Sequence, residues 1–265
     1  HSPGPARPPG LRTFLLLLIV LAGPRAGAQT TVGAMTFASE GVTINTNQPG
    51  YAYLTNGTLT LTADISSQAT SAYLNSLVNI REFSASFTYT ATTSGGFFAD
   101  GAAFVIQNSP QQASALGTAG SGLGYEGITS SAALAFNIYG GHPIGITLAQ
   151  DGYLNNYQYT GTGNVSLVSY LPVRVDLVYS GGGLSTELTD GTNGSIFQTS
   201  YLIDLPSRVG GDLAYVGFTG ATGLGVSVQQ VSEFTFTTVP EPPVAMLLLA
   251  GAAGIRWRLR RRGAG

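Results

Sequence analysis

Residues 83–90 read FSASFTYT, with an apolar or aromatic side chain at every odd position and a hydroxyl at every even position. A period of two predicts a β-strand that buries one face and turns the other toward water. Similar alternation recurs around residues 173–179 and 234–237. These segments predict half-buried strands of antiparallel sheets.

The rest of the central chain has the composition of an all-β domain. Two largely apolar runs, residues 102–106 and 132–139, predict strands that are covered on both faces. Thr, Val, Tyr and Phe are abundant, and 37 glycines, some in Asn-Gly and Asp-Gly pairs, supply tight turns. No central stretch offers a long amphipathic helix. We therefore expect an all-β fold, a two-sheet sandwich of about a dozen strands.

The charges are distributed unevenly along the chain. The formal net charge is −2, from 11 basic and 13 acidic residues. Eight arginines lie in residues 1–28 and 256–262, so residues 29–239 combine three arginines with twelve acids and carry a charge of −9. A segment with so few basic residues cannot neutralise a phosphate backbone, which argues against nucleic acid as a partner. The absence of cysteine excludes disulfides, thiolate metal sites and cysteine nucleophiles.

The N-terminal residues have the three parts of a secretory signal peptide. Arg7 and Arg12 precede an apolar run at residues 14–22, and the small-x-small sequence Ala26-Gly27-Ala28 follows. At about 1.5 Å per residue, this apolar run is too short to cross a hydrocarbon core of about 30 Å. We therefore expect residues 1–28 to direct export and to be removed by cleavage after Ala28.

The C-terminal residues carry a second processing signal. Residues 239–243 read VPEPP, residues 244–255 are apolar, and residues 256–262 hold five arginines. This order resembles the PEP-CTERM sorting tail of bacterial exported proteins. The resemblance implies that a membrane-embedded exosortase recognises Pro240, Glu241 and Pro242 and removes the tail. A permanent short anchor is the alternative, although the apolar run reaches only about 18 Å.

These signals divide the chain into a signal peptide (1–28), a β-sandwich (29–238) and a sorting tail (239–265). We expect the precursor to associate transiently with the inner membrane. The mature protein is expected at the cell surface or in the extracellular matrix, as an acidic domain without its terminal arginines.

Asp100 is the most informative side chain of the predicted sandwich. Together with Gly101 it opens a strongly apolar strand at residues 102–106. A carboxylate at the mouth of a strand can accept hydrogen bonds from two neighbouring sugar hydroxyls, and a glycine beside it lets a ligand approach the backbone. The alternative is an ordinary Asp-Gly turn.

Four segments, in the same order, resemble the legume-type (L-type) lectins. They are residues 99–104 (ADGAAF), 122–125 (GLGY), 133–139 (ALAFNIY) and 214–223 (AYVGFTGATG). The likeness extends over about residues 37–238 and implies a concanavalin A-like jelly-roll β-sandwich, with sugar bound by loops at one end of a concave sheet. It also implies a sugar-binding role for Asp100, a cis peptide bond before it, and a second sugar loop near Gly122.

The metal ligands of that family do not carry over. Its metal strand reads Glu-x-Asp-x-Tyr-x-Asn, whereas this chain has Ala135, Asn137, Tyr139 and Gly141 at the matching positions. Calcium needs several oxygen ligands, usually including carboxylates. We therefore expect no structural metal pair and no cofactor, although Asp151 could support a weak calcium site.

The segment that begins at Asn137 nevertheless offers groups for a glycan. Asn137 and His142 are candidate contacts, and Tyr153 and Tyr157 can present ring faces to a sugar. Ordinary loop aromatics are the alternative for each ring. The complete set expected to bind carbohydrate is Asp100, Gly101, Gly122, Asn137 and His142.

Enzymatic functions have weaker support. A glycosidase of the same fold needs two carboxylates that flank the scissile bond, and residues 132–139 contain none. His142 is the only histidine of residues 29–239, and no Gly-x-Ser-x-Gly elbow lies between a strand and a helix. We expect an exported, non-catalytic protein that binds extracellular or cell-surface polysaccharide. A structural matrix or biofilm protein that keeps the fold without binding sugar is the alternative, and a glycosidase is a weaker one.

Overall fold

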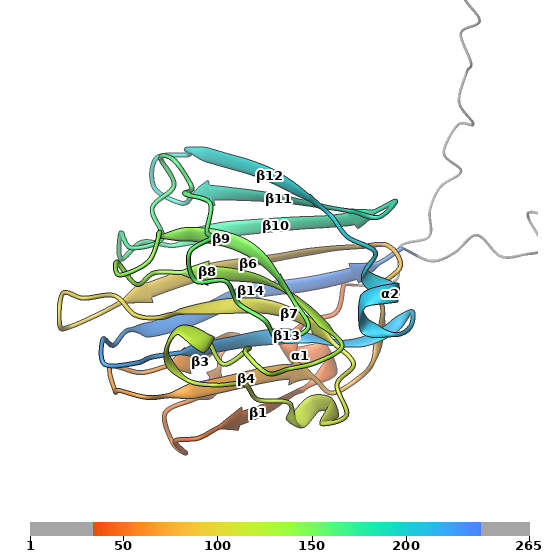
Figure 1. The fold of residues 1–265 in the computed structure, drawn as a ribbon, viewed down its shortest axis with the longest axis horizontal. Helices are drawn as coiled ribbons and strands as arrows, with labels where there is room; N and C mark the ends of the chain where they lie inside the picture. Colours follow the sequence, from red (N-terminus) through yellow and green to blue (C-terminus); the bar gives the residue numbers. More distant parts are fainter. Residues whose placement is uncertain (1–33, 240–265) are drawn as a thin grey trace, which may run out of the picture.

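The computed structural model describes residues 34–239, which form two stacked seven-stranded β-sheets (Figure 1). The predicted signal peptide, and the predicted sorting tail beyond Val239, lie outside the described residues. We call the sheet that contains residues 101–107 the front sheet and the other the back sheet. Neighbouring strands pair antiparallel in both, so the all-β sandwich expected from the sequence is confirmed.

The front sheet places the loops around Asp100. In spatial order its strands are β1 (Val42–Thr46), β4 (Ala69–Leu74), β13 (Leu213–Ala221), β7 (Gly101–Gln107), β8 (Ser131–Asn137) and β9 (Gly145–Gln150), while β5 (Val78–Asn79) pairs with one end of β13.

The back sheet covers one face of the front sheet. Its strands, again in spatial order, are β12 (Ile196–Leu202), β11 (Gly183–Asp190), β10 (Val173–Ser180), β6 (Phe83–Thr92), β14 (Val228–Thr238), β3 (Thr58–Thr62) and β2 (Tyr53–Thr55).

Helical structure in the described chain is limited to short connections. These are α1 (Phe37–Glu40), α2 (Leu205–Val209) and two 3-10 turns, η1 (Gln112–Ser114) and η2 (Gly120–Gly122). None of the helices that the structure describes is long and apolar enough to cross a membrane.

The alternating stretch at residues 83–90 lies within β6, and its pattern is realised as predicted. Phe83, Ala85, Phe87 and Tyr89 are buried between the sheets, whereas the hydroxyl side chains between them lie on the outer face. The ring of Phe87 packs against that of Phe218 on the front sheet, with centroids 4.9 Å apart. Aromatic pairs of this kind add about 0.5–1.5 kcal/mol beyond the burial of their area.

The two apolar runs form β7 and β8, and both strands are buried on both faces. Phe104 and Phe136 face the back sheet and belong to the main core. Ala103, Val105 and Ala135 face the other way, into a second buried cluster that residues from the segments 113–128 and 154–159 cover. The second apolar run leaves the sheet at Asn137 rather than at residue 139, because the chain turns there into the β8–β9 loop.

The chain ends and Asp100 lie at opposite ends of the sandwich. Thr238, at the end of β14, is paired with Phe83 at the start of β6, whereas Asp100 follows the end of β6. The amide of Met35 donates to the carbonyl oxygen of Phe236 (2.8 Å), so both ends of the described chain leave side by side. In Figure 1 they leave at the right, and the yellow β6–β7 loop and the blue β13–β14 loop project at the left.

Candidate functional site

Asp100 lies at the end of the front sheet, where the β6–β7 loop enters β7. The peptide bond Ala99–Asp100 is cis, as the family resemblance implied. The Asp100 amide donates to the carbonyl oxygen of Ala221 (2.9 Å), and the Asp100 carbonyl oxygen accepts from the amide of Ile138 (3.0 Å). These bonds tie Asp100 to the ends of β13 and β8, the strands on either side of β7, and hold its backbone in place.

The Asp100 carboxylate is buried and incompletely hydrogen-bonded. Only 6% of the residue is exposed, and Oδ2 has no hydrogen-bond partner among residues 34–239. Burial raises the pKa of Asp100 to about 6, against the opposing effects of the nearby Gly223 amide and of His142. A buried polar atom without a partner costs about 1–3 kcal/mol, and more when it is charged. A donor supplied by a ligand would remove that cost.

Two further polar atoms near Asp100 lack partners within the described part of the chain. They are the hydroxyl oxygen of Tyr159 and Nδ1 of His142. Burial raises the pKa of Tyr159, and the charge of Asp100 raises it further, so this hydroxyl lies within electrostatic range of the carboxylate. Asp100, Tyr159 and His142 therefore present three free hydrogen-bonding atoms in one region, which we call the Asp100 site.

Aromatic rings border the Asp100 site. The ring of His142 packs edge-on against the rings of Tyr139 and Tyr157, with centroids 5.6 and 5.1 Å apart. The ring of Tyr157 is mostly exposed and can be approached by a ligand. Tyr153 is also exposed, but no ring or hydrogen-bond contact connects its side chain to the other described residues of the site.

Three loops meet beside the Asp100 carboxylate. A Cβ atom added to Gly223 would lie 2.8 Å from Asp100 Oδ2 and 3.5 Å from the Cα atom of Gly120. The amide of Gly120 in turn donates to the carbonyl oxygen of Thr222 (3.0 Å). The glycine-rich segment 117–127 and the β13–β14 loop thus pack together against the β6–β7 loop.

The two glycines predicted to bind carbohydrate, Gly101 and Gly122, are both packed closely against other parts of the protein. A Cβ atom on Gly101 would lie 1.9 Å from the carbonyl oxygen of Phe136, and the φ of Gly101 is +149°. The close approach at Gly101 is therefore to strand β8 rather than to a ligand. Gly122 is buried in η2, where a Cβ atom would lie 2.0 Å from Thr118 Oγ1, and its amide donates to the carbonyl oxygen of Ala119.

Asn137 ends β8 and uses its amide group within its own loop. Its Nδ2 donates to the carbonyl oxygens of Tyr139 and Pro143, both at 3.0 Å, and its Oδ1 accepts from the amide of Tyr139 at 3.3 Å. The side chain is buried. Asn137 therefore fastens the loop that carries His142, and the structure gives it no free group directed at the Asp100 site.

The residues of this sheet do not fit the metal pair that the family resemblance implies. The two positions for acids hold Ala135 and Asn137, which supply a methyl group and an engaged amide. The Asp151 carboxylate forms an ion pair with Arg208 at 2.7 Å. Throughout residues 34–239, no three His, Cys, Asp or Glu side chains are grouped so as to hold a metal ion.

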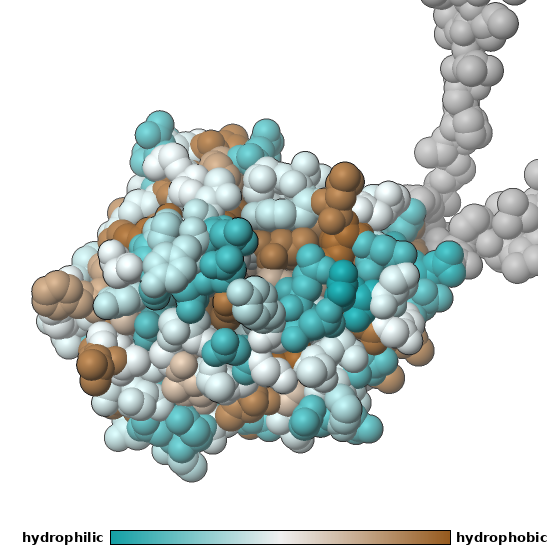
Figure 2. Space-filling view, in the orientation of Figure 1, coloured by the Kyte–Doolittle hydropathy of each residue, from teal (hydrophilic) through white to brown (hydrophobic). Residues whose placement is uncertain are grey.

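Tyr159, Gly223 and an apolar rim were not predicted from the sequence. Phe97 in the β6–β7 loop is 80% exposed, and Leu224 in the β13–β14 loop is 98% exposed. Figure 2 shows apolar residues projecting over these two loops at the left end of the molecule. The glycine-rich stretch at residues 220–225 indicates a loop in the sequence, but it does not indicate that this loop contacts Asp100.

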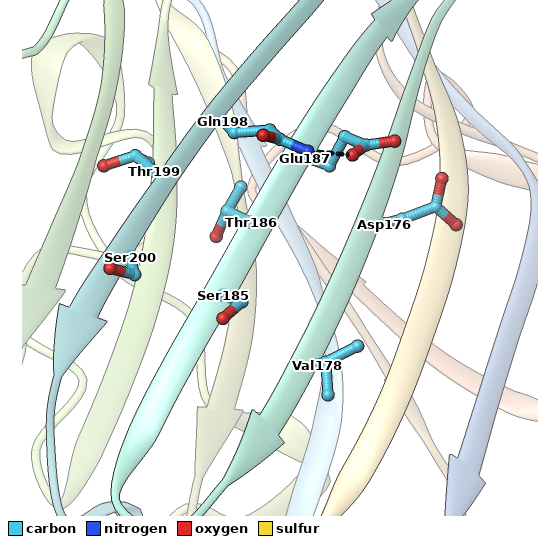
Figure 3. A pocket seen from close by; sticks show the side chains of 8 residues that line it. All are labelled: Asp176, Val178, Ser185, Thr186, Glu187, Gln198, Thr199 and Ser200. Carbon is cyan, nitrogen blue, oxygen red and sulfur yellow. Dashed lines mark hydrogen bonds between the residues drawn. The ribbon is translucent and has the colours of Figure 1, made fainter.

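A pair of carboxylates lies elsewhere, on the outer face of the back sheet (Figure 3). Asp176 on β10 is directly opposite Glu187 on β11. Asp176 is ion-paired with Arg174 at 3.1 Å, and Glu187 accepts a hydrogen bond from Gln198. Both acids are thus engaged by neighbouring side chains, and neither belongs to the sheet of the Asp100 site.

Comparison with solved structures identifies the fold. The chain is similar to the lectin from Bauhinia forficata in complex with GalNAc, with 20% identity, a TM-score of 0.64, and coverage of 80% of this chain and 99% of that one. It is also similar to the metal-free form of lectin I-B4 from Griffonia simplicifolia, with 17% identity, a TM-score of 0.66, and coverage of 78% and 100%.

Arcelin-5, a lectin-like defense protein from Phaseolus vulgaris, matches at 17% identity with a TM-score of 0.58, and the match covers 78% of this chain and 96% of that one. Searches of protein-family models and of curated proteins found no match. At these identities the likeness establishes a legume-lectin, concanavalin A-like fold.

Proposed function

We propose that this protein is a non-catalytic carbohydrate-binding protein whose ligand occupies the Asp100 site. One observation carries the proposal. Three buried polar atoms, Asp100 Oδ2, the Tyr159 hydroxyl and His142 Nδ1, lack partners in residues 34–239 and lie at one loop-lined end of the sandwich. Buried polar groups in folded proteins are normally hydrogen-bonded, so such a cluster suits a ligand rich in hydroxyls.

The chemistry of the site matches a sugar. An ionised carboxylate accepts hydrogen bonds from sugar hydroxyls, and such charge-assisted bonds are stronger than neutral ones. A tyrosine hydroxyl can both donate and accept, so Tyr159 can complete the set. The rings of Tyr139 and Tyr157 offer apolar faces at its border. The −9 charge of residues 29–239 disfavours anionic polymers, which makes a neutral glycan the expected ligand.

Two lines of support come from the fold and from the ends of the chain. Lectins solved with GalNAc and with galactose are among the proteins of similar structure. We also propose that the signals at residues 1–28 and 239–265 direct export and exosortase processing, which would deliver the domain to the cell surface or matrix. Because the described chain ends lie opposite Asp100, attachment at either end would leave the site facing outward.

A glycan array probed with residues 29–239 and with the variant Asp100→Asn tests this proposal. We expect the wild-type domain to bind a defined group of neutral glycans. We expect the variant to lose that binding while its melting temperature near neutral pH stays the same or rises, because the variant buries no ionised carboxylate at this position. Absence of binding to any glycan or extracellular polysaccharide would contradict the proposal, as would equal binding by the variant.

A structural matrix protein with a lectin fold is the second candidate. Its support is the replacement of the family's acids by Ala135 and Asn137, with the amide of Asn137 engaged inside its loop. Such a protein would bind no glycan on the array but would be retained in the extracellular matrix. A glycosidase has less support, because the paired carboxylates Asp176 and Glu187 are engaged by Arg174 and Gln198.

A further inference from the structure

The β8–β9 loop carries one group of the Asp100 site, His142, and one ring that borders the site, Tyr139. This loop runs from Ile138 to Ile144 and includes Tyr139 and His142. The position of the His142 ring relative to Asp100 therefore depends on how this loop is held. At its start, the amide of Ile138 donates to the Asp100 carbonyl oxygen (3.0 Å).

Asn137 joins the two ends of this loop. One amide nitrogen donates to the carbonyl oxygen of Tyr139 near the start of the loop and to that of Pro143 near its end. The amide of His142 donates to the same Tyr139 carbonyl oxygen at 3.1 Å. A single buried side chain thus closes the loop over a span of seven residues, 137 to 143, and the closed loop holds His142.

We propose that Asn137 is a positioning residue that shapes the Asp100 site without a metal ion, so that glycan binding by this chain does not require divalent cations. This inference rests on the proposed function. The lectin resemblance would place a carboxylate at position 137, and a carboxylate has no hydrogens to donate to the Tyr139 and Pro143 carbonyls. The amide directs its hydrogens at these oxygens, which leaves a poor environment for a cation.

The second loop of the site is also fastened by protein groups. The loop after β9 carries Tyr157 and Tyr159, and its first residue, Asp151, is ion-paired with Arg208. The amide of Gly152 donates to the Tyr125 hydroxyl at 3.1 Å. At the far end of the loop, Thr160 and Ile146 exchange backbone hydrogen bonds of 2.8 and 3.0 Å. Asp151, the carboxylate of this loop that could support a weak calcium site, thus already has an arginine as its partner.

The first experiment measures metals and glycan separately on the purified chain. Calcium and manganese chloride are titrated calorimetrically into the EDTA-treated protein, and its melting temperature is recorded with EDTA and with each metal. We expect no binding heat, an unchanged melting temperature, and the same glycan affinity in EDTA as in calcium. Stoichiometric metal binding that raises the melting temperature, or glycan binding that EDTA abolishes, would overturn the inference and leave the proposed function standing.

The second experiment tests Asn137 itself. In Asn137→Ala we expect hydrogen exchange at the amides of Tyr139 and His142 to become at least about tenfold faster. In Asn137→Asp, whose carboxylate can still accept from the Tyr139 amide, we expect this change at His142. Both variants should show a changed imidazole NMR signal of His142. Glycan affinity should fall by at least about tenfold, and the affinity of each variant should be the same in EDTA as in calcium. These loop measurements need no glycan, so they remain decisive even if the proposed function fails.

A matched control is Asn45→Ala. The Asn45 amide also donates to a loop carbonyl, that of Ala113 (2.8 Å), and to Ser71 Oγ (3.1 Å), but it lies on the edge strand β1 of the same sheet. This variant loses bonds of the same kind without touching the β8–β9 loop, so its His142 signal should match the wild type. If Asn137→Ala leaves the exchange of Tyr139 and His142 and the His142 signal as they are in the wild type, Asn137 does not position the loop and the inference is wrong.

Discussion

Gly223 lies directly against the carboxylate of Asp100, so closely that a Cβ atom at position 223 would stand 2.8 Å from Oδ2. The glycine keeps open the space on one side of Asp100 Oδ2, a buried carboxylate oxygen that has no hydrogen-bond partner in residues 34–239. Any ligand that donates to this oxygen must use the space that remains around it. The site therefore requires a residue without a side chain at position 223 as well as the carboxylate of Asp100.

Gly223→Ala is expected to weaken glycan binding more than it weakens the fold. The added methyl group crowds Asp100 Oδ2, the free end of a side chain that can shift, and such overpacking costs about 1–3 kcal/mol of stability. Affinity should fall by at least about tenfold because the carboxylate leaves its position. Titration calorimetry and thermal unfolding measure the two effects. Gly95→Ala is the control, because the Cβ atom added there would lie 3.8 Å from the nearest atom outside the adjacent residues. A Gly223→Ala variant that binds glycan as well as this control would contradict the proposed geometry of the site.

Glycan affinity and stability are expected to change with pH in opposite directions. Burial raises the pKa of Asp100 to about 6 in the folded chain, from an ordinary value of 3.8. Between these values the folded state holds a proton that the unfolded state has lost, so this group lowers stability as the pH rises through about 6. The ionised carboxylate is the better acceptor for sugar hydroxyls, so affinity should rise over the same range.

The measurement is a series of calorimetric titrations and melting curves from about pH 4.5 to pH 8, around the Asp100 pKa of about 6. In Asp100→Asn, which cannot ionise at this position, both contributions should disappear. An affinity in the wild type that is constant across this range would show that the carboxylate of Asp100 is not the acceptor.

Tyr159→Phe separates binding from stability. The Tyr159 hydroxyl is without a partner in the described chain, so its removal should leave stability unchanged or raise it by about 1 kcal/mol. Glycan affinity should fall by about 2–10-fold, the equivalent of one lost hydrogen bond. Tyr201→Phe on the back sheet removes another hydroxyl that lacks a described partner and should leave affinity intact. Equal affinities of the two variants and the wild type would remove Tyr159 from the site.

Gly101→Ala is expected to prevent folding or to reduce stability by at least about 3 kcal/mol. The reason is the 1.9 Å separation between the added Cβ atom and the carbonyl oxygen of Phe136, combined with a φ of +149°. Gly211→Ala should be tolerated, because the added Cβ atom would have no atom within 4 Å other than those of residue 211 and its two chain neighbours. Chemical denaturation of both variants decides the point, and a Gly101→Ala variant as stable as the wild type would contradict the packing of β7 against β8.

The sequence predicted the sheets better than it predicted the site. Alternation in residues 83–90 identified the buried face of β6, and the runs at 102–106 and 132–139 identified strands covered on both sides, because these patterns follow from periodicity alone. The position of Asp100 at a strand mouth followed from its place before an apolar run. Its neighbours Tyr159 and Gly223 come from loops distant in sequence, and no local pattern reports which loops meet.

Asn137 illustrates what a residue pattern leaves undetermined. An amide at the end of β8 can face a ligand or return to its own backbone, and the choice depends on the path of the next six residues. Here the chain turns so that the Tyr139 and Pro143 carbonyls face Nδ2. Gly101 is similar, since the close approach that requires a glycine is made by Phe136 of the adjacent strand.

The most direct test of glycan binding at the Asp100 site is calorimetric titration of the strongest array ligand into the wild type, Asp100→Asn and Asp176→Asn. Asp176→Asn removes one carboxylate from the back sheet, so it controls for the loss of one negative charge away from the Asp100 site. We expect the affinity of Asp100→Asn to fall by at least about tenfold, since hydrogen bonds to charged groups contribute about 1.5–3 kcal/mol, while Asp176→Asn binds like the wild type. An Asp100→Asn protein that binds the ligand as tightly as the wild type would contradict the account.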